Sequence, residues 1–185
     1  MTLANGAGIH DRPKQAESLI ITDVTIYYLQ MTQRSQLQAK VAPAGLTVEC
    51  VTPASGAVNQ QYYREVGAAW AWQDRLSWSL QQWRDYAERD VLSTWIAQYN
   101  GDEIGYAELE RQDGGDVELR YFGLLPAFIG RGLGAALLTR MVEIAWSLPD
   151  ARRVWVHTCT NDHPYALANY TSRGFAIYRT QFGAA

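Results

Sequence analysis

The sequence predicts a mixed α/β (α+β) fold in which helices cover both faces of one sheet. Of its 185 residues 48% are hydrophobic, which is enough for one domain with a sizeable core. Two turn signals in the middle of the chain predict an antiparallel meander. The second half alternates strands with helices, as parallel crossover units do. A meander followed by crossovers gives a mixed sheet.

The first element follows a polar stretch. Residues 1–21 contain glycine and proline and no apolar run, so we expect a flexible N-terminal tail and a single domain over residues 22–185. The segment 20–29 is rich in β-branched and aromatic residues and predicts a strand. A second strand is predicted at 46–51.

The interval 58–87 has helical spacing of its apolar and aromatic residues, with a break near 73–75. We therefore expect two helices there. Strands at 94–99 and 104–109 follow, and Asn100-Gly101 between them is typical of a tight hairpin.

The C-terminal part begins with a third strand of the meander. The pattern predicts, in order, a strand at 117–125, an amphipathic helix at 132–148, a strand at 154–158, a helix at 164–172 and a strand at 175–180.

Charge and cysteine content exclude several classes. The formal net charge is -3, whereas a general nucleic-acid binder carries a basic excess. No apolar stretch approaches the roughly 20 residues that span a bilayer. Two distant cysteines, Cys50 and Cys159, make no disulfide framework, so we expect a cytoplasmic protein.

A glycine-rich loop, 129–135, lies between a predicted strand and a predicted helix. Glycines on alternate positions let backbone N–H groups approach an anion at the positive end of the helix. A nucleotide P-loop needs Lys followed by Ser or Thr, and Ala135 stands there instead. Three interpretations stay open: a dinucleotide loop, a coenzyme A pyrophosphate loop, and a tightly packed helix entrance.

These residues resemble the GNAT superfamily of N-acetyltransferases. Gly132 and Gly134 match that family's coenzyme A loop, although Ile129 stands where Gln or Arg is usual. A second motif continues the match, in which a Tyr is followed four residues later by Gly-Phe. Tyr170 and Gly174-Phe175 fit it, while His163 replaces the usual Asn.

The resemblance implies a three-layer fold with a mixed, mostly antiparallel, twisted sheet, and acetyl-CoA as co-substrate without a metal. It also implies that the strand before the loop offers backbone groups to the coenzyme. The cofactor-binding residues expected from it are Phe122, Gly123, Leu124, Ile129, Gly130, Arg131, Gly132, Leu133, Gly134, Ala135 and His163.

Acetyl transfer to an amine needs an acid for the leaving thiolate and a base for the amine. The motif implies Tyr170 as the acid, because a phenol with a pKa of about 10 is protonated at neutral pH. Glu118 is the proposed base, with Glu108, Glu110 and His163 as rivals.

A metal site is the alternative use of the polar residues near 157–163. His157, Cys159, Asp162 and His163 lie close in sequence, but their spacing matches no common zinc pattern. Cys159 as a covalent acyl carrier is disfavoured, because nothing in the sequence lowers its pKa.

The resemblance places the acceptor near the first two helices, where aromatic residues gather. Trp70, Trp72 and Arg75 are the candidate acceptor-binding residues, suited to a small amine with an apolar group and a carboxylate. Packing of these tryptophans against the sheet is the competing interpretation.

The prediction is an acetyl-CoA-dependent N-acetyltransferase that acts on a primary amine of a small molecule or protein. The alternative is an inactive coenzyme A-binding sensor, and a nicotinamide-dependent fold is the third. The expected partner is the amine acceptor, without nucleic acid or membrane, and the sequence is compatible with a homodimer.

Overall fold

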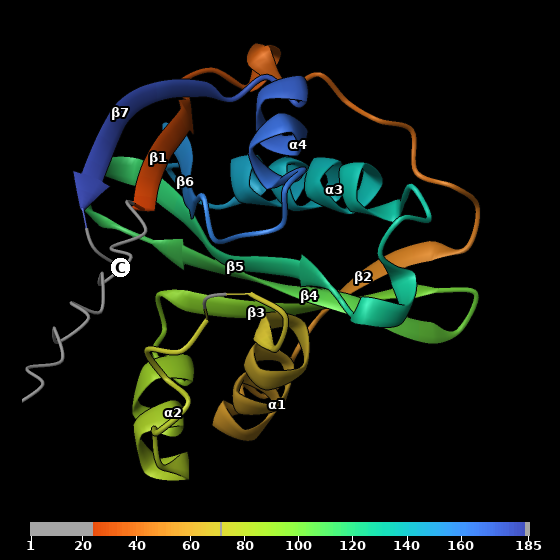
Figure 1. Cartoon of the computed structure of the whole chain (residues 1–185), viewed down its shortest axis with the longest axis vertical. Helices are drawn as coiled ribbons and strands as arrows, with labels where there is room; N and C mark the ends of the chain where they lie inside the picture. Colours follow the sequence, from red (N-terminus) through yellow and green to blue (C-terminus); the bar gives the residue numbers. More distant parts are fainter. Residues whose placement is uncertain (1–23, 71, 184–185) are drawn as a thin grey trace, which may run out of the picture.

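The computed structural model describes residues 24–70 and 72–183, so the predicted tail at 1–21 lies outside the described residues. Seven strands form one sheet in the order β2-β3-β4-β5-β6-β1-β7. Helices α1 and α2 cover one face, and α3 and α4 cover the other (Figure 1). This confirms the predicted three layers. In chain order the elements are β1 (Val24–Met31), β2 (Leu46–Cys50), α1 (Gly56–Gly67), α2 (Leu80–Ala87), β3 (Leu92–Tyr99), β4 (Asp102–Arg111), β5 (Asp116–Leu124), α3 (Leu133–Ser147), β6 (Arg153–Cys159), α4 (Ala166–Ser172) and β7 (Ala176–Gly183).

The meander β3-β4-β5 follows from its turns. Asn100 and Gly101 have φ of 54° and 91°, the left-handed pair that a two-residue hairpin needs. Every strand pairing is antiparallel except β5 with β6, which is parallel. The predicted mixed, mostly antiparallel sheet is therefore confirmed.

Strand β1 takes a place that local sequence signals did not predict. It lies between β6 and β7 and pairs antiparallel with both. On its other side β6 pairs with β5 over three register positions only, the last being Glu118 with Trp155. Beyond that position both strands continue without pairing to each other. The sheet is thus forked between β5 and β6.

The helical interval differs from the prediction. Residues 68–70 and 72–79 are not helical, so the interruption is much longer than the expected break at 73–75. The chain turns back there, and Trp72 packs so closely on Gly67 that a Cβ at that glycine would come within 2.6 Å of the Trp72 Cβ atom. Helix α2 begins at Leu80, and the hydroxyl of its N-cap residue Ser79 accepts a hydrogen bond from the N–H of Gln82.

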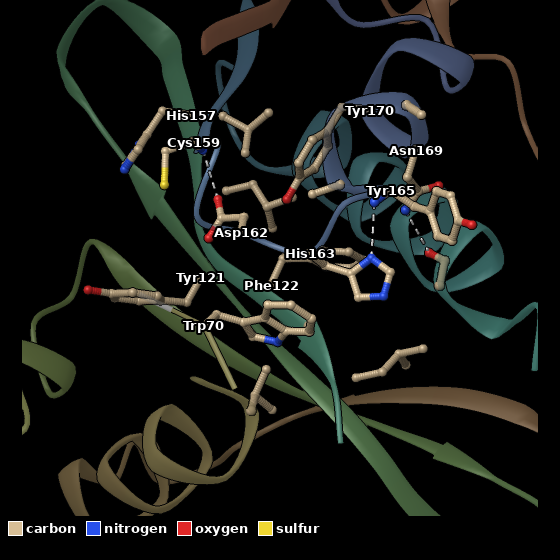
Figure 2. Close-up of a pocket in the computed structure, with 18 of the residues that line it drawn as sticks. Trp70, Tyr121, Phe122, His157, Cys159, Asp162, His163, Tyr165, Asn169 and Tyr170 are labelled. Carbon is tan, nitrogen blue, oxygen red and sulfur yellow. Dashed lines mark hydrogen bonds between the residues drawn. The ribbon is translucent and has the colours of Figure 1, made fainter. Parts of the chain in front are cut away.

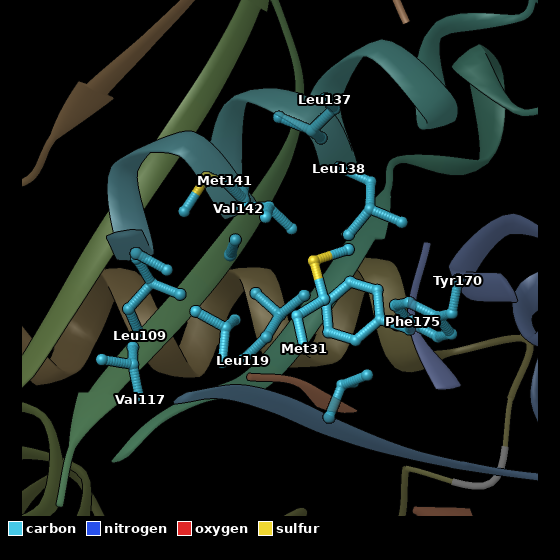
Figure 3. Packing of buried hydrophobic residues seen from close by; sticks show 14 of the residues in the cluster. Met31, Leu109, Val117, Leu119, Leu137, Leu138, Met141, Val142, Tyr170 and Phe175 are labelled. Carbon is cyan, nitrogen blue, oxygen red and sulfur yellow. The ribbon is translucent and has the colours of Figure 1, made fainter. Parts of the chain in front are cut away.

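The main core lies between the sheet and α3 (Figure 3). Leu137, Leu138 and Met141 of α3 are fully buried against Leu119 of β5 and Val156 of β6. Helix α3 is therefore fixed against the two strands that form the fork.

Candidate active site

A cavity of about 820 Å³ occupies the fork between β5 and β6. Its walls come from those strands, the start of α3, α4 and the linker after α1 (Figure 2). This volume lies in the range of small-molecule and cofactor sites.

The glycine loop forms one end of this cavity. Gly132 is the N-cap of α3 with φ of 77°, and no side chain bonds the N–H groups of the first turn. Gly130 has φ of 81°, and a Cβ at either glycine would meet nothing within 4 Å. Backbone conformation therefore requires these glycines. The uncapped N-terminus of a 15-residue helix provides N–H donors and a positive dipole end for an anion.

The members of the loop divide between two hollows. Ile129, Gly130, Gly132, Gly134 and Ala135 line the main cavity. Arg131 and Leu133 instead border a neighbouring hollow of about 460 Å³, together with Lys40. The Arg131 guanidinium lies 4.9 Å from the centre of the Phe128 ring.

Strand β5 supplies Phe122, Gly123 and Leu124 to the cavity wall. A Cβ at Gly123 would lie 2.3 Å from the Cγ1 atom of Val66 in α1. The family resemblance implies that this glycine is a coenzyme contact. The structure provides a separate reason, which is the close approach of α1 to β5.

Tyr170 of α4 projects its hydroxyl toward the cavity (Figure 2). The residue is 6% exposed, and its ring centre lies 6.2 Å from that of Phe122 and 5.9 Å from that of Phe175. Burial, followed by the nearby Asp162 carboxylate, raises the pKa of Tyr170 well above its ordinary value. The phenol is therefore protonated at neutral pH and is able to donate.

His163 lines the same cavity as the glycine loop and the linker after α1. Its Nδ1 accepts a hydrogen bond from the Tyr165 N–H at 3.1 Å. Its ring contacts the Trp70 indole with 4.9 Å between ring centres. His163 thus contacts the linker after α1 through Trp70 while it lines the same cavity as the glycine loop.

The proposed base, Glu118, is buried, with its side chain 3% exposed, and does not line the cavity. Its Oε2 accepts hydrogen bonds from Gln112 at 2.8 Å and Arg120 at 3.1 Å. Its Oε1 lies 3.5 Å from Nδ1 of His157, which does line the cavity.

The rival carboxylates do not line the cavity either. Glu108 is fully buried and accepts hydrogen bonds from Asn59 at 2.7 Å and Tyr86 at 2.6 Å. Burial raises the pKa of Glu108 above its ordinary value. Glu110 is bound by Arg89 at 2.9 Å and by Arg120 at 3.1 Å.

The predicted acceptor residues are only partly brought together. Trp70 and Trp72 line the cavity, whereas Arg75 does not. Arg75 is 8% exposed, and its guanidinium stacks 4.0 Å from the centre of the Tyr86 ring. Asp74 and Tyr121 also line this end and were not predicted. The place of Asp74 in the helix break was the available signal for that residue.

The polar cluster of β6 and the following turn has a structural explanation. Asp162 accepts hydrogen bonds from the Thr158 hydroxyl at 2.7 Å and the Cys159 N–H at 2.9 Å. Across residues 24–70 and 72–183, no group of three or more His, Cys, Asp or Glu side chains is placed to hold a metal ion. Burial, followed by Asp162, raises the pKa of the Cys159 thiol, the opposite of what a nucleophilic cysteine needs.

Comparison with known protein families shows which family the chain belongs to. The model of the acetyltransferase (GNAT) family matches residues 57–175, which hold the glycine loop and Tyr170. The chain belongs to the GNAT acetyltransferase family. Uncharacterized N-acetyltransferases of Mycobacterium tuberculosis and Mycobacterium bovis are 37% identical over 87 residues, 46% of this chain and 53% of theirs. The chain thus spans about half the length of the curated relatives it matches.

Solved GNAT structures share the fold. The GCN5-related N-acetyltransferase from Sphaerobacter thermophilus superposes with a TM-score of 0.64 at 17% identity, over 86% of this chain and 50% of that one. The enzyme of the same description from Kribbella flavida gives 0.60 at 18%, over 84% and 55%. At these identities the likeness establishes the fold alone. Within the described part of the chain, no helix is long and apolar enough to cross a membrane.

Proposed function

We propose that this GNAT protein transfers an acetyl group from acetyl-CoA directly to a primary amine of a small molecule or protein. The observation that carries the proposal is one cavity that holds both the uncapped glycine-loop end of α3 and the Tyr170 phenol. The first suits a pyrophosphate, and the second suits a leaving thiolate.

The residues fit acetyl-CoA. The loop from Gly130 to Ala135 would hold the pyrophosphate, and the backbone of Phe122, Gly123 and Leu124 would hold the pantetheine arm and polarise the thioester carbonyl. His163 would contact the coenzyme from the opposite wall. When bound, the coenzyme supplies an activated acetyl thioester. Tyr170 supplies the proton that the leaving sulfur takes.

The acceptor end suits an amine with an apolar or aromatic group. Trp70, Trp72 and Tyr121 offer aromatic faces, and the exposed carboxylate of Asp74 lies among them. A carboxylate beside aromatic rings favours an ammonium group. Arg75 does not line the cavity, but it would hold two residues that do. Its guanidinium lies 5.2 Å from the centre of the Tyr121 ring, and its Nε lies 3.6 Å from Oδ2 of Asp74.

A thermal unfolding scan with acetyl-CoA, free coenzyme A and NAD(H), followed by a thiol-release screen against amines, tests the proposal. A ligand at about 100 times its Kd adds roughly 2.7 kcal/mol, which raises Tm by several degrees. Stabilisation by coenzyme A species together with amine-dependent thiol release supports it. Stabilisation by NAD(H) alone refutes it. Coenzyme binding without transfer to any amine favours the sensor alternative.

A further inference from the structure

His157 and Glu118 form a pair at the fork of the sheet that the proposed function does not yet use. His157 lies on β6, lines the acceptor end of the cavity and has a side chain that is 46% exposed. Glu118 lies on β5 with its side chain 3% exposed. The pair bridges the two strands near their last shared register position, Glu118 with Trp155. The imidazole is therefore open to solvent and to the cavity, while the carboxylate is buried on its far side.

The surroundings of this pair contain several charged or titratable groups. Arg120 of β5 bonds Glu118, and Tyr28 of β1 lies with its ring centre 6.0 Å from that of His157. Arg179 of β7 stacks on Tyr28, at 4.7 Å. The other titratable neighbours are Arg153 and Cys159 on β6, Tyr178 on β7, and Asp74 and Asp162 at the cavity wall. Among the described carboxylates, only that of Glu118 lies within 4.0 Å of a His157 ring nitrogen, at 3.5 Å.

The other carboxylates and the other histidine that line the cavity already make hydrogen bonds. Oδ2 of Asp162 holds the turn after β6 through two hydrogen bonds. Asp74 accepts the Tyr63 hydroxyl at 2.6 Å, on a side chain that is 68% exposed. Nδ1 of His163 is already bonded by a backbone N–H. Among the carboxylates and histidines that line the cavity in the described chain, His157 is the one that remains, and it has a carboxylate against one ring nitrogen.

We propose that His157 is the general base toward the acceptor amine and that Glu118 is its positioning residue, an inference that rests on the proposed acetyl transfer. The buried carboxylate beside Nδ1 keeps the proton on that nitrogen. Nε2 is then the free base, at the atom that is not committed to Glu118. This assigns to Glu118 a positioning part, whereas the sequence predicted that Glu118 is itself the base.

The proton balance is complete with the described residues. Nε2 of His157 takes one proton from the ammonium of the acceptor and later releases it to solvent. The N–C bond to the acetyl group forms, and the C–S bond of the thioester breaks. Tyr170 donates its proton to the departing sulfur and recovers one from the nitrogen that becomes the amide. The net reaction yields the acetylated amine, free thiol and one proton.

The first test uses the free protein. The full chain has three histidines, so ¹⁵N NMR of the imidazoles can be assigned by comparison with His157→Asn. We expect the neutral His157 ring to carry its proton on Nδ1 in the wild type and to lose this preference in Glu118→Gln. Glu110→Gln is the matched control, because Glu110 shares Arg120 with Glu118 and makes no ion pair with His157. An Nε2–H ring in the wild type, or an equal change in both variants, overturns the positioning role.

The second test is the pH profile of kcat with acetyl-CoA and an amine that the wild type acetylates. We expect His157→Asn to lower kcat about 100-fold or more at neutral pH and to remove the acidic limb. Exogenous imidazole should restore part of the rate in His157→Ala, since the half-exposed site is open to solvent. An unchanged acidic limb in the His157 variants overturns the base assignment alone. A wild type that binds acetyl-CoA and acetylates no amine overturns the proposed function, and this inference with it.

Discussion

Replacement of Gly123 by alanine would place a methyl group between β5 and α1. The new Cβ would lie 2.3 Å from Cγ1 of Val66, which is 2% exposed and tightly packed. Carbon atoms prefer a separation of about 3.5–4.0 Å, so at least about 1.2 Å must be recovered. A valine in a helix has one strongly preferred rotamer and cannot turn away. The helix itself must therefore move.

Overpacking of this kind costs about 1–3 kcal/mol in the free energy of unfolding, or about 2–12 °C in Tm for a chain of this length. Urea and thermal unfolding of Gly123→Ala measure it. The backbone of the cavity wall moves with the strand, so we also expect weaker binding of coenzyme A in the same variant.

A double variant isolates the cause. Val66→Ala removes the atom that the new methyl would meet and costs about 2 kcal/mol by itself as a cavity. In Gly123→Ala/Val66→Ala the losses should fall short of their sum by about 1–3 kcal/mol. Losses that add to within about 0.5 kcal/mol would refute the packing argument and return the glycine to its predicted role as a coenzyme contact.

Three further predictions concern single residues. Tyr170→Phe should lower kcat about 100-fold or more while coenzyme A affinity is kept. Because the pKa of Tyr170 is raised, the wild type should show no loss of rate from ionisation of this phenol below about pH 10. Because the pKa of Glu108 is raised in the folded state, its contribution to stability is present below about pH 4 and is lost as pH rises. The difference between the Tm of Glu108→Gln and the Tm of the wild type should therefore increase from about pH 4 to about pH 8. Gly105→Ala should destabilise more than Gly123→Ala, because its Cβ would lie 2.2 Å from the backbone oxygen of Gly123, which no second substitution removes.

Local sequence rules predicted the elements and the glycine loop. The Asn100-Gly101 turn, the apolar face of α3 and the spacing of the loop each depend on neighbours within a few residues, and all appear in the structure. Tyr170, which the family motif implies as the acid, lines the cavity.

The parts that escaped prediction depend on distant contacts. The linker 68–79 keeps an apolar spacing like that of a helix, yet Trp72 packs back on Gly67 and breaks it. The sequence predicts Arg75 as an acceptor-binding cation, but aromatic rings from α2 and β5 enclose its guanidinium. The place of β1 between β6 and β7 depends on register with strands more than a hundred residues away, which no local pattern contains.

The place of β1 has a consequence for the order in which the fold assembles. Strand β1 precedes β6 by more than a hundred residues and is synthesised first. Because Tyr28 pairs with His157, β1 lacks this partner until β6 has been made. Pairing across so long a loop is slow, and an unpaired apolar strand invites association with other chains. Because β6 shares only three register positions with β5, its alignment depends largely on β1. We therefore expect the wall that bears His157 to be among the last parts to form during biosynthesis, after the glycine loop and α3 have already packed.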